Sequence, residues 1–148
     1  MNDWTAVLWT VTDSIGLGRL NPTNESFEAF QSAVFLAKRA GVDLGYNFRP
    51  VDGMPYSRVL ARDFDSLFRR CPPASLRFDR ETRAKLRRLA DALAVPSTYG
   101  GTFESWIVAV ASAELGQRSV SPDRESAPET ARLVEAARAR LGGAGIAA

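Results

Sequence analysis

The chain has 148 residues, 45% of them hydrophobic and 24% charged, which is typical of one globular domain that buries a core without disulfide bonds. One cysteine and no histidine exclude an internal disulfide framework, a Cys/His zinc site and catalysis that relies on an imidazole base. The net charge of +2 is too small to indicate a polyanionic partner by itself. Because we find neither a membrane-spanning apolar run nor a signal-peptide pattern, we predict a cytoplasmic protein with no membrane partner, metal or cofactor.

The first two predicted helices are indicated by apolar residues at helical spacing. Residues 3–15 place an apolar stripe on one face of a helix. A second helix follows, capped either by Asn21 or by Asn24, and stops at Gly41. Its apolar stripe is wide and indicates contact with several neighbours. The stripe consists of Phe27, Phe30, Val34, Phe35, Leu36 and Ala37.

The period of the pattern changes after residue 42. Leu44, Tyr46 and Phe48 alternate with small or polar residues, which predicts a short strand that stops at Pro50. The aromatic side chains around the following turn can stack on bases or on a partner, but such residues more often close the core. We interpret them mainly as core and expect Tyr56 to be the exposed one that contacts a partner.

Four more helices are predicted after a turn at residues 52–55. Three open at capping residues, and the remaining one follows a flexible glycine turn. Their expected starts are Ser57, Asp79, Thr102 and Ser126, the last in a capping box with Glu129. The whole is a mainly α (α+β), winged-helix-like single domain at residues 1–141. It has about six helices and a short strand or hairpin, and a flexible tail covers residues 142–148.

The helix that starts near Thr102 carries the most apolar stretch of the chain. Residues 106–113 contain no charge, which predicts that this helix is central in the core. Glu104 and Glu114 flank the stretch. We interpret both as solvated helix ends rather than as a buried pair of acids.

An enzyme is not expected from these residues. Asp63 and Asp65 are two positions apart on a helix, so they point in different directions and make a poor shared site. We interpret Cys71 as a packing residue rather than as a reactive thiol. The remaining enzymatic alternative, a carboxylate-dependent hydrolase, requires a deep pocket with converging acids.

Arginine is the most suggestive feature, because it supplies 17 of the 19 basic residues. A GC-rich genome produces the same bias, but the planar guanidinium group also suits phosphate. Two predicted helices carry the arginines on outer faces. The candidates for nucleic-acid binding are Arg58, Arg62, Arg69 and Arg70 on the helix from Ser57, and Arg80, Arg83 and Arg87 on the helix from Asp79.

These arginines favour phosphate binding only if both faces converge on one stripe that acids do not neutralise. Such a stripe binds DNA by counterion release and can enter a major groove. Aspartate and glutamate residues are interspersed among the arginines. An ordinary solvated surface and a surface for an acidic protein partner therefore stay open as alternatives.

Several segments resemble a known family. The residues Phe30–Leu36, Leu44–Phe48 and Pro55–Ser57, followed by an apolar tryptophan helix at Phe103–Leu115, are similar to the YwgA-like family of small prokaryotic proteins. The similarity to the antitoxin-associated Panacea domain is looser. Met54 replaces the glycine of the family's Gly-Pro-Tyr-Ser pattern. The resemblance spans roughly residues 4–141 and implies a winged-helix-like domain near regulatory or defence systems, but it implies no activity.

The leading hypothesis is therefore a non-enzymatic module that binds nucleic acid, mostly through DNA phosphates, or has a regulatory role. The alternative is a protein-interaction or oligomerisation module, antitoxin-like or a defence accessory, that binds a protein partner or forms a homodimer. A large exposed apolar patch or a stable dimer would indicate the alternative.

Overall fold

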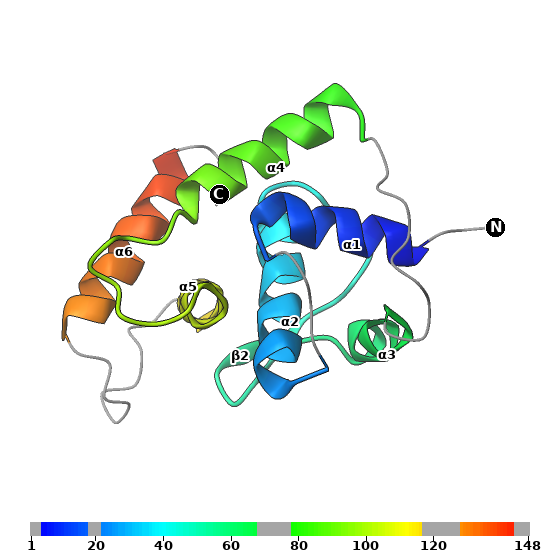
Figure 1. Cartoon of the computed structure of the whole chain (residues 1–148), viewed down its shortest axis with the longest axis horizontal. Coiled ribbons are helices and arrows are strands. Elements are labelled where there is room, and N and C mark those ends of the chain that lie inside the picture. Colours follow the sequence, from blue (N-terminus) through cyan, green and yellow to red (C-terminus); the bar gives the residue numbers. More distant parts are fainter. Residues whose placement is uncertain (1–3, 18–21, 68–77, 117–127, 144–148) are drawn as a thin grey trace.

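The computed structural model describes residues 4–17, 22–67, 78–116 and 128–143. Within these ranges the chain forms six helices and one two-stranded antiparallel hairpin (Figure 1). The helices are α1 (Trp4–Ile15), α2 (Asn24–Arg39), α3 (Arg58–Leu67), α4 (Arg80–Ala92), α5 (Phe103–Gly116) and α6 (Pro128–Gly143). The hairpin joins β1 (Arg49–Val51) to β2 (Met54–Tyr56). The predicted mainly helical α+β class is thereby confirmed. Among the described residues, no helix is both long enough and apolar enough to cross a membrane.

Helix α2 lies at the centre of the fold and contacts α1, α3, α4, α5 and β2 (Figure 1). Every residue from 29 to 37 is buried, so this helix has no solvated face along most of its length. Phe30 packs against Phe64 of α3 with ring centroids 5.1 Å apart. The wide apolar stripe predicted from the sequence therefore serves several neighbours at once.

Helix α5 is the main partner of α2 in the core. Trp106, Ile107, Val110 and Ala111 are fully buried, as the uncharged stretch predicted. The indole Nε1 of Trp106 donates a hydrogen bond to the carbonyl oxygen of Leu93 at 3.0 Å. This bond joins α5 to the end of α4, whose leucines face the same core.

A buried pair of hydrogen bonds positions the start of α3. The Nε2 group of Gln31 donates to the carbonyl oxygen of Ser57 at 3.0 Å, and the Ser57 N–H donates to Gln31 Oε1 at 2.9 Å. Ser57 Oγ accepts a hydrogen bond from the Leu60 N–H at 3.2 Å, which confirms the predicted cap. Because Ser57 lies between Tyr56 and Arg58, this contact with α2 orients the chain from which both side chains leave.

The strand predicted at residues 44–48 is wrong, because β1 begins only at Arg49. Gly45 has a φ of 89° and its N–H donates to Asp43 Oδ1 at 2.8 Å, so a local turn interrupts the extended backbone. Pro50 does not stop the strand either, since it lies in β1 opposite Pro55. Each strand of a two-stranded ribbon has a free edge, where proline is tolerated.

The predicted ends of two helices also need correction. Helix α2 is capped by Thr23 rather than by Asn21 or Asn24, and Thr23 Oγ1 accepts a hydrogen bond from the Ser26 N–H at 3.1 Å. Helix α6 continues to Gly143, two residues into the predicted tail. The capping residue proposed for α6, Ser126, lies outside the described residues.

The predicted cap of α4 is confirmed at Asp79. Its Oδ1 accepts a hydrogen bond from the Thr82 N–H at 2.7 Å. Hydrogen bonds from the side chain and backbone of Thr82 hold the pKa of the Asp79 carboxyl below its ordinary value. The charged form of the cap is therefore the favoured one at the N-terminus of α4.

Candidate functional site

The structure places the arginines predicted to bind nucleic acid in two separate groups. The exposed ones are Arg58 and Arg62 on α3, and Arg80, Arg83 and Arg87 on α4. Figure 1 shows α1 between α3 and α4, and α1 contacts both helices. The described arginines therefore do not form the single uninterrupted stripe on which the two-helix hypothesis depended, so any phosphate binding has to rest on one of the two groups. Arg69 and Arg70 lie outside the described residues.

The arginines of α4 occupy the side of the helix that faces away from its buried leucines. Leu86 and Leu89 are buried, and α4 contacts α1, α2 and α6. The spacing of positions 80, 83 and 87 places three side chains on one face. Together with Ala84, these three arginines line a pocket of about 240 Å³.

Among the described residues, none of the three forms an ion pair with a carboxylate. Two acids adjoin Arg80 in the sequence: Asp79 caps α4 and interacts electrostatically with Arg83, and Glu81 is paired with Lys85 at 3.5 Å. Arg88 and Asp91 are also exposed on α4. The outer surface of this helix therefore carries more positive than negative charge.

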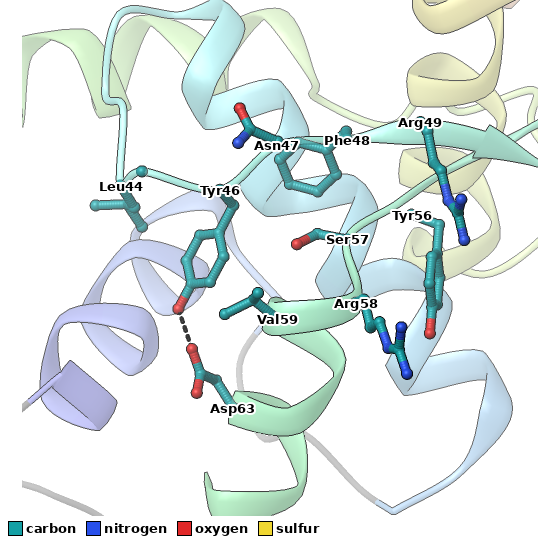
Figure 2. A pocket seen from close by; sticks show the side chains of 11 residues that line it. Leu44, Tyr46, Asn47, Phe48, Arg49, Tyr56, Ser57, Arg58, Val59 and Asp63 are labelled. Atoms are coloured by element: carbon teal, nitrogen blue, oxygen red, sulfur yellow. Dashed lines mark hydrogen bonds between the residues drawn. The ribbon is translucent and has the colours of Figure 1, made fainter.

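An open cleft of about 570 Å³ lies between residues 44–49, the end of β2 and the start of α3 (Figure 2). Arg49, Tyr56 and Arg58 line one side of this cleft. Arg49 and Tyr56 are paired in the hairpin register, so their side chains leave the same face of the ribbon. Both arginines are exposed, and neither forms an ion pair within the described part of the chain.

The opposite side of the cleft carries a carboxylate. The hydroxyl group of Tyr46 donates a hydrogen bond to Asp63 Oδ2 (Figure 2). Tyr46 is 4% exposed, and its carbonyl oxygen accepts a hydrogen bond from Lys38 Nζ at 2.8 Å. Asp65, by contrast, is exposed and does not line the cleft, in agreement with the prediction that the two aspartates point apart. The cleft therefore has cations on one side and an acid on the other.

Tyr56 is half-buried at the rim of this cleft, next to Phe27 with ring centroids 6.4 Å apart. It was predicted to contact a partner, and its place in a cleft is compatible with that prediction. Arg49 was missed, because the strand had been placed before it. A two-residue turn at Asp52-Gly53 would have paired Arg49 with Tyr56, and that turn was the available signal.

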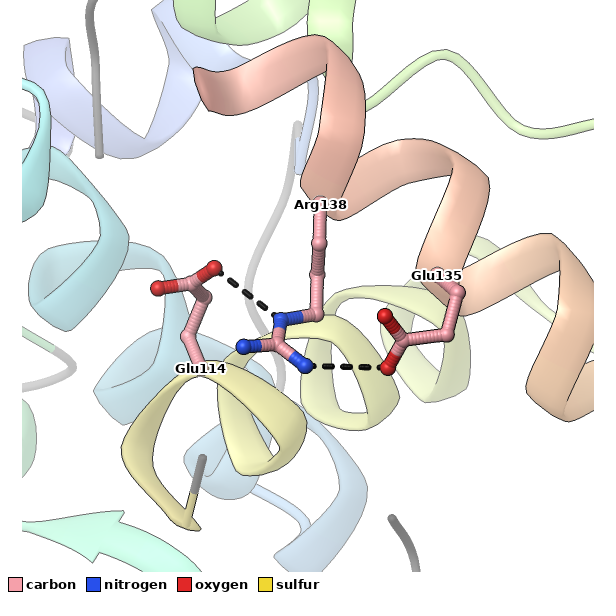
Figure 3. Close-up of polar contacts among 3 residues, drawn as sticks. All are labelled: Glu114, Glu135 and Arg138. Carbon is pink, nitrogen blue, oxygen red and sulfur yellow. Dashed lines mark hydrogen bonds and ion pairs between the residues drawn. The ribbon is translucent and has the colours of Figure 1, made fainter. Parts of the chain in front are cut away.

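The prediction that Glu114 is a solvated helix end is wrong. Glu114 is only 8% exposed, and Arg138 Nε donates a hydrogen bond to Glu114 Oε1 at 3.1 Å (Figure 3). A second guanidinium nitrogen donates to Glu135 Oε1 at 2.9 Å. Burial alone lowers the pKa of Arg138, but the hydrogen bonds to both glutamates outweigh it and raise the pKa above its ordinary value. The ion pair between Glu114 and Arg138 joins α5 to α6.

Glutamine at position 114 tests the contribution of this buried pair. We expect Glu114→Gln to lower the free energy of unfolding by about 1 kcal/mol, because the carboxylate that accepts from the Arg138 guanidinium becomes a neutral amide. The matched variant Glu135→Gln should cost less than about 0.5 kcal/mol, since the Glu135 side chain is 60% exposed. Urea denaturation measures both values. Equal losses in the two variants would contradict the proposed difference in burial.

The described residues contain no group of three or more histidine, cysteine, aspartate or glutamate side chains that could hold a metal ion. No protein-family model, curated protein or solved structure matches the chain. The resemblance to the YwgA-like family and the relation to winged helices therefore stay predictions. The class that the geometry itself defines is a small, mainly helical α+β domain with an exposed arginine face on α4 and a polar cleft beside α3.

Proposed function

We propose that the protein is a non-enzymatic module that binds nucleic acid through the exposed face of α4. The observation that supports this most directly is the set of three arginines at positions 80, 83 and 87, which share that face and form no ion pair within the described residues. Unpaired guanidinium groups bind phosphate oxygens and release the counterions of the nucleic acid. Phosphate contacts position a protein but read no sequence, so the binding is weakly sequence-specific.

The arginines of α4 are better candidates for phosphate binding than those of α3, because three of them share one face of a single helix. Helix α1 separates α3 from α4, so the arginines of the two helices do not form a continuous stripe along which one nucleic-acid backbone could lie. On α3, Asp63 and Asp65 follow the arginines closely in the chain. On α4, Asp79 caps the helix and Glu81 is paired with Lys85, and the helix carries more cations than acids. The proposal therefore rests on one helix face.

The triple variant R80A/R83A/R87A tests this proposal in a salt titration of binding to a short DNA duplex. The logarithm of the binding constant falls with the logarithm of salt by about 0.9 per phosphate contact. Losing three contacts should weaken binding at low salt and reduce that slope by about 2.7. Fluorescence anisotropy of a labelled duplex measures both quantities.

Two control variants separate phosphate contact from general charge. R80K/R83K/R87K keeps the three charges and should keep the slope within about one contact of the original protein. Arg132→Ala removes an exposed cation from α6, away from the α4 face, and should leave the slope unchanged. If the original protein shows no binding at low salt, or if the triple alanine variant keeps the full slope, nucleic-acid binding by α4 is refuted.

The alternative function, a protein-interaction or homodimerisation module, would be indicated by a large exposed apolar patch. Among the described residues, the exposed large apolar side chains are Val51, Val59 and Val95. They lie on β1, on α3 and after α4, and single exposed valines are ordinary on protein surfaces. Measuring the mass in solution without nucleic acid distinguishes the two functions, since a stable dimer would favour the alternative.

A further inference from the structure

We propose that the cleft beside α3 binds a 5′-nucleotide unit, either a free nucleoside monophosphate or the phosphorylated end of a strand. This site is separate from the α4 face, and its occupation does not depend on duplex binding. Its volume of about 570 Å³ lies within the range of about 300–1,000 Å³ that is usual for small-molecule sites. The chemistry of its two sides determines which ligand fits.

The phosphate is assigned to the side of the cleft that carries Arg49 and Arg58. Both guanidinium groups are exposed and have no carboxylate partner among the described residues, and Figure 2 shows them on the same side, next to Tyr56. A guanidinium group presents parallel N–H donors that match phosphate oxygens. Arg58 is the first residue of α3 and follows its cap, Ser57, so the positive N-terminal end of that helix adds to the attraction.

An aromatic ring is available for the base between these two arginines. Tyr56 lines the cleft and is half-buried, and its ring lies edge-on to that of Phe27 with centroids 6.4 Å apart. Phe48 also lines the cleft, and its ring packs edge-on against Phe35 with centroids 5.4 Å apart. Bases of any sequence stack on such rings, so the ring contact adds affinity without selecting one base.

The acid on the far side distinguishes a nucleotide from a simple anion. Asp63 accepts the hydroxyl proton of Tyr46 on Oδ2, and Oδ1 has no hydrogen-bond partner within the described residues. This oxygen can accept a hydrogen bond from a ribose hydroxyl or from an amino group of a base. A fatty acid offers no donor at its far end, and bare phosphate has neither a ring to stack on Tyr56 nor a second group to reach Asp63. A ligand that joins an anionic group and a flat ring to a hydrogen-bond donor satisfies all three parts of the cleft.

Titrations followed by two-dimensional NMR test this assignment on the whole chain. The probes are ribonucleoside 5′-monophosphates, the corresponding nucleosides, inorganic phosphate, and a short oligonucleotide with and without a 5′-phosphate. We expect saturable binding of the monophosphates with shifts at residues 44–49 and 56–63, and binding weaker by about tenfold or more for nucleosides and for phosphate alone. Preference for the phosphorylated oligonucleotide over the monophosphates would assign the site to strand ends, and the reverse would assign it to free nucleotides.

Variants separate the contacts of the cleft from those of α4. R49A/R58A should weaken monophosphate binding by about tenfold or more. Arg62→Ala, on α3 but outside the cleft lining, and R80A/R83A/R87A should both leave it unchanged. Binding of duplex DNA by α4 and binding of a nucleotide in the cleft are therefore tested separately, and either proposal can fail without the other.

The role of Asp63 is tested with a matched pair of variants. Asp63→Asn keeps an acceptor for the Tyr46 hydroxyl but turns the other oxygen into an amino donor, so it should reduce the preference for monophosphates over inorganic phosphate. Tyr46→Phe removes the internal hydrogen bond but keeps the carboxylate, so it should keep the preference. If no monophosphate saturates the protein, if phosphate alone binds equally well, or if R49A/R58A binds like the original chain, the nucleotide assignment is overturned.

Discussion

Replacing Trp106 with alanine is expected to lower the free energy of unfolding by about 3–5 kcal/mol. Trp106 is fully buried in α5 and is the largest fully buried side chain among the described residues. Its ring lies 5.1 Å from that of Tyr99, and its Nε1 donates to the carbonyl oxygen of Leu93 at 3.0 Å. The variant therefore loses transfer free energy, leaves a cavity, and removes a hydrogen bond between α5 and the end of α4.

Two further tryptophan variants separate the contribution of the indole hydrogen bond from that of buried volume, and compare a central with a peripheral position. Trp106→Phe keeps most of the apolar volume but loses the indole donor, so a smaller loss of about 1–3 kcal/mol is expected. Trp9→Ala removes the same side chain from α1, where Trp9 is only partly buried, and should cost less than Trp106→Ala. Urea denaturation followed by far-ultraviolet circular dichroism measures all three. A loss for Trp106→Ala no larger than that for Trp9→Ala would contradict its central position in the core.

Replacing Gln31 with leucine is expected to cost about 2–4 kcal/mol, the second largest effect. Leucine fills a similar volume but loses both hydrogen bonds to Ser57. The carbonyl oxygen of Ser57 keeps the Ala61 N–H as a donor at 3.0 Å, whereas its own buried N–H is left without the Gln31 acceptor. Because Ser57 carries Tyr56 and Arg58 on either side, the same variant should also weaken ligand binding in the cleft.

The variant Gln31→Glu distinguishes lost hydrogen bonds from lost packing. A protonated glutamic acid can accept from the Ser57 N–H and donate to its carbonyl oxygen, as glutamine does. Burial raises the pKa of this carboxyl above the unfolded value of about 4.3. The variant should therefore be most stable below that value and should lose stability as pH rises towards the folded-state pKa. If its stability relative to the original chain is independent of pH between these limits, the hydrogen-bond explanation is wrong.

The sequence by itself determined the features that depend on neighbours a few residues apart. Ser57 and Asp79 were predicted as caps because the side chain of a cap bonds to an N–H three residues later, and both bonds are present. The uncharged stretch at 106–113 predicted the central helix α5 because helical period and apolarity together indicate burial. The exposed face of α4 followed from the same periodicity.

Local patterns failed where one residue changed the backbone. Alternation at residues 44–48 indicated a strand, yet the positive φ of Gly45 and its bond to Asp43 make a turn there, so the strand begins at Arg49. Alternation describes which side chains face inward, and Tyr46 is indeed buried. It does not describe the backbone hydrogen bonds that define a strand.

Only the tertiary structure decided which distant side chains meet. Gln31 and Ser57 are 26 positions apart, and Glu114 and Arg138 are 24 apart, so no local period relates the members of either pair. The separation of the α3 and α4 arginines and the meeting of Arg49 with Arg58 in one cleft have the same origin. Each helix turns its apolar face towards the core, and the packing of those faces sets where the polar faces point. Sequence period specifies the faces of a helix, but the direction in which a face points depends on every helix packed against it.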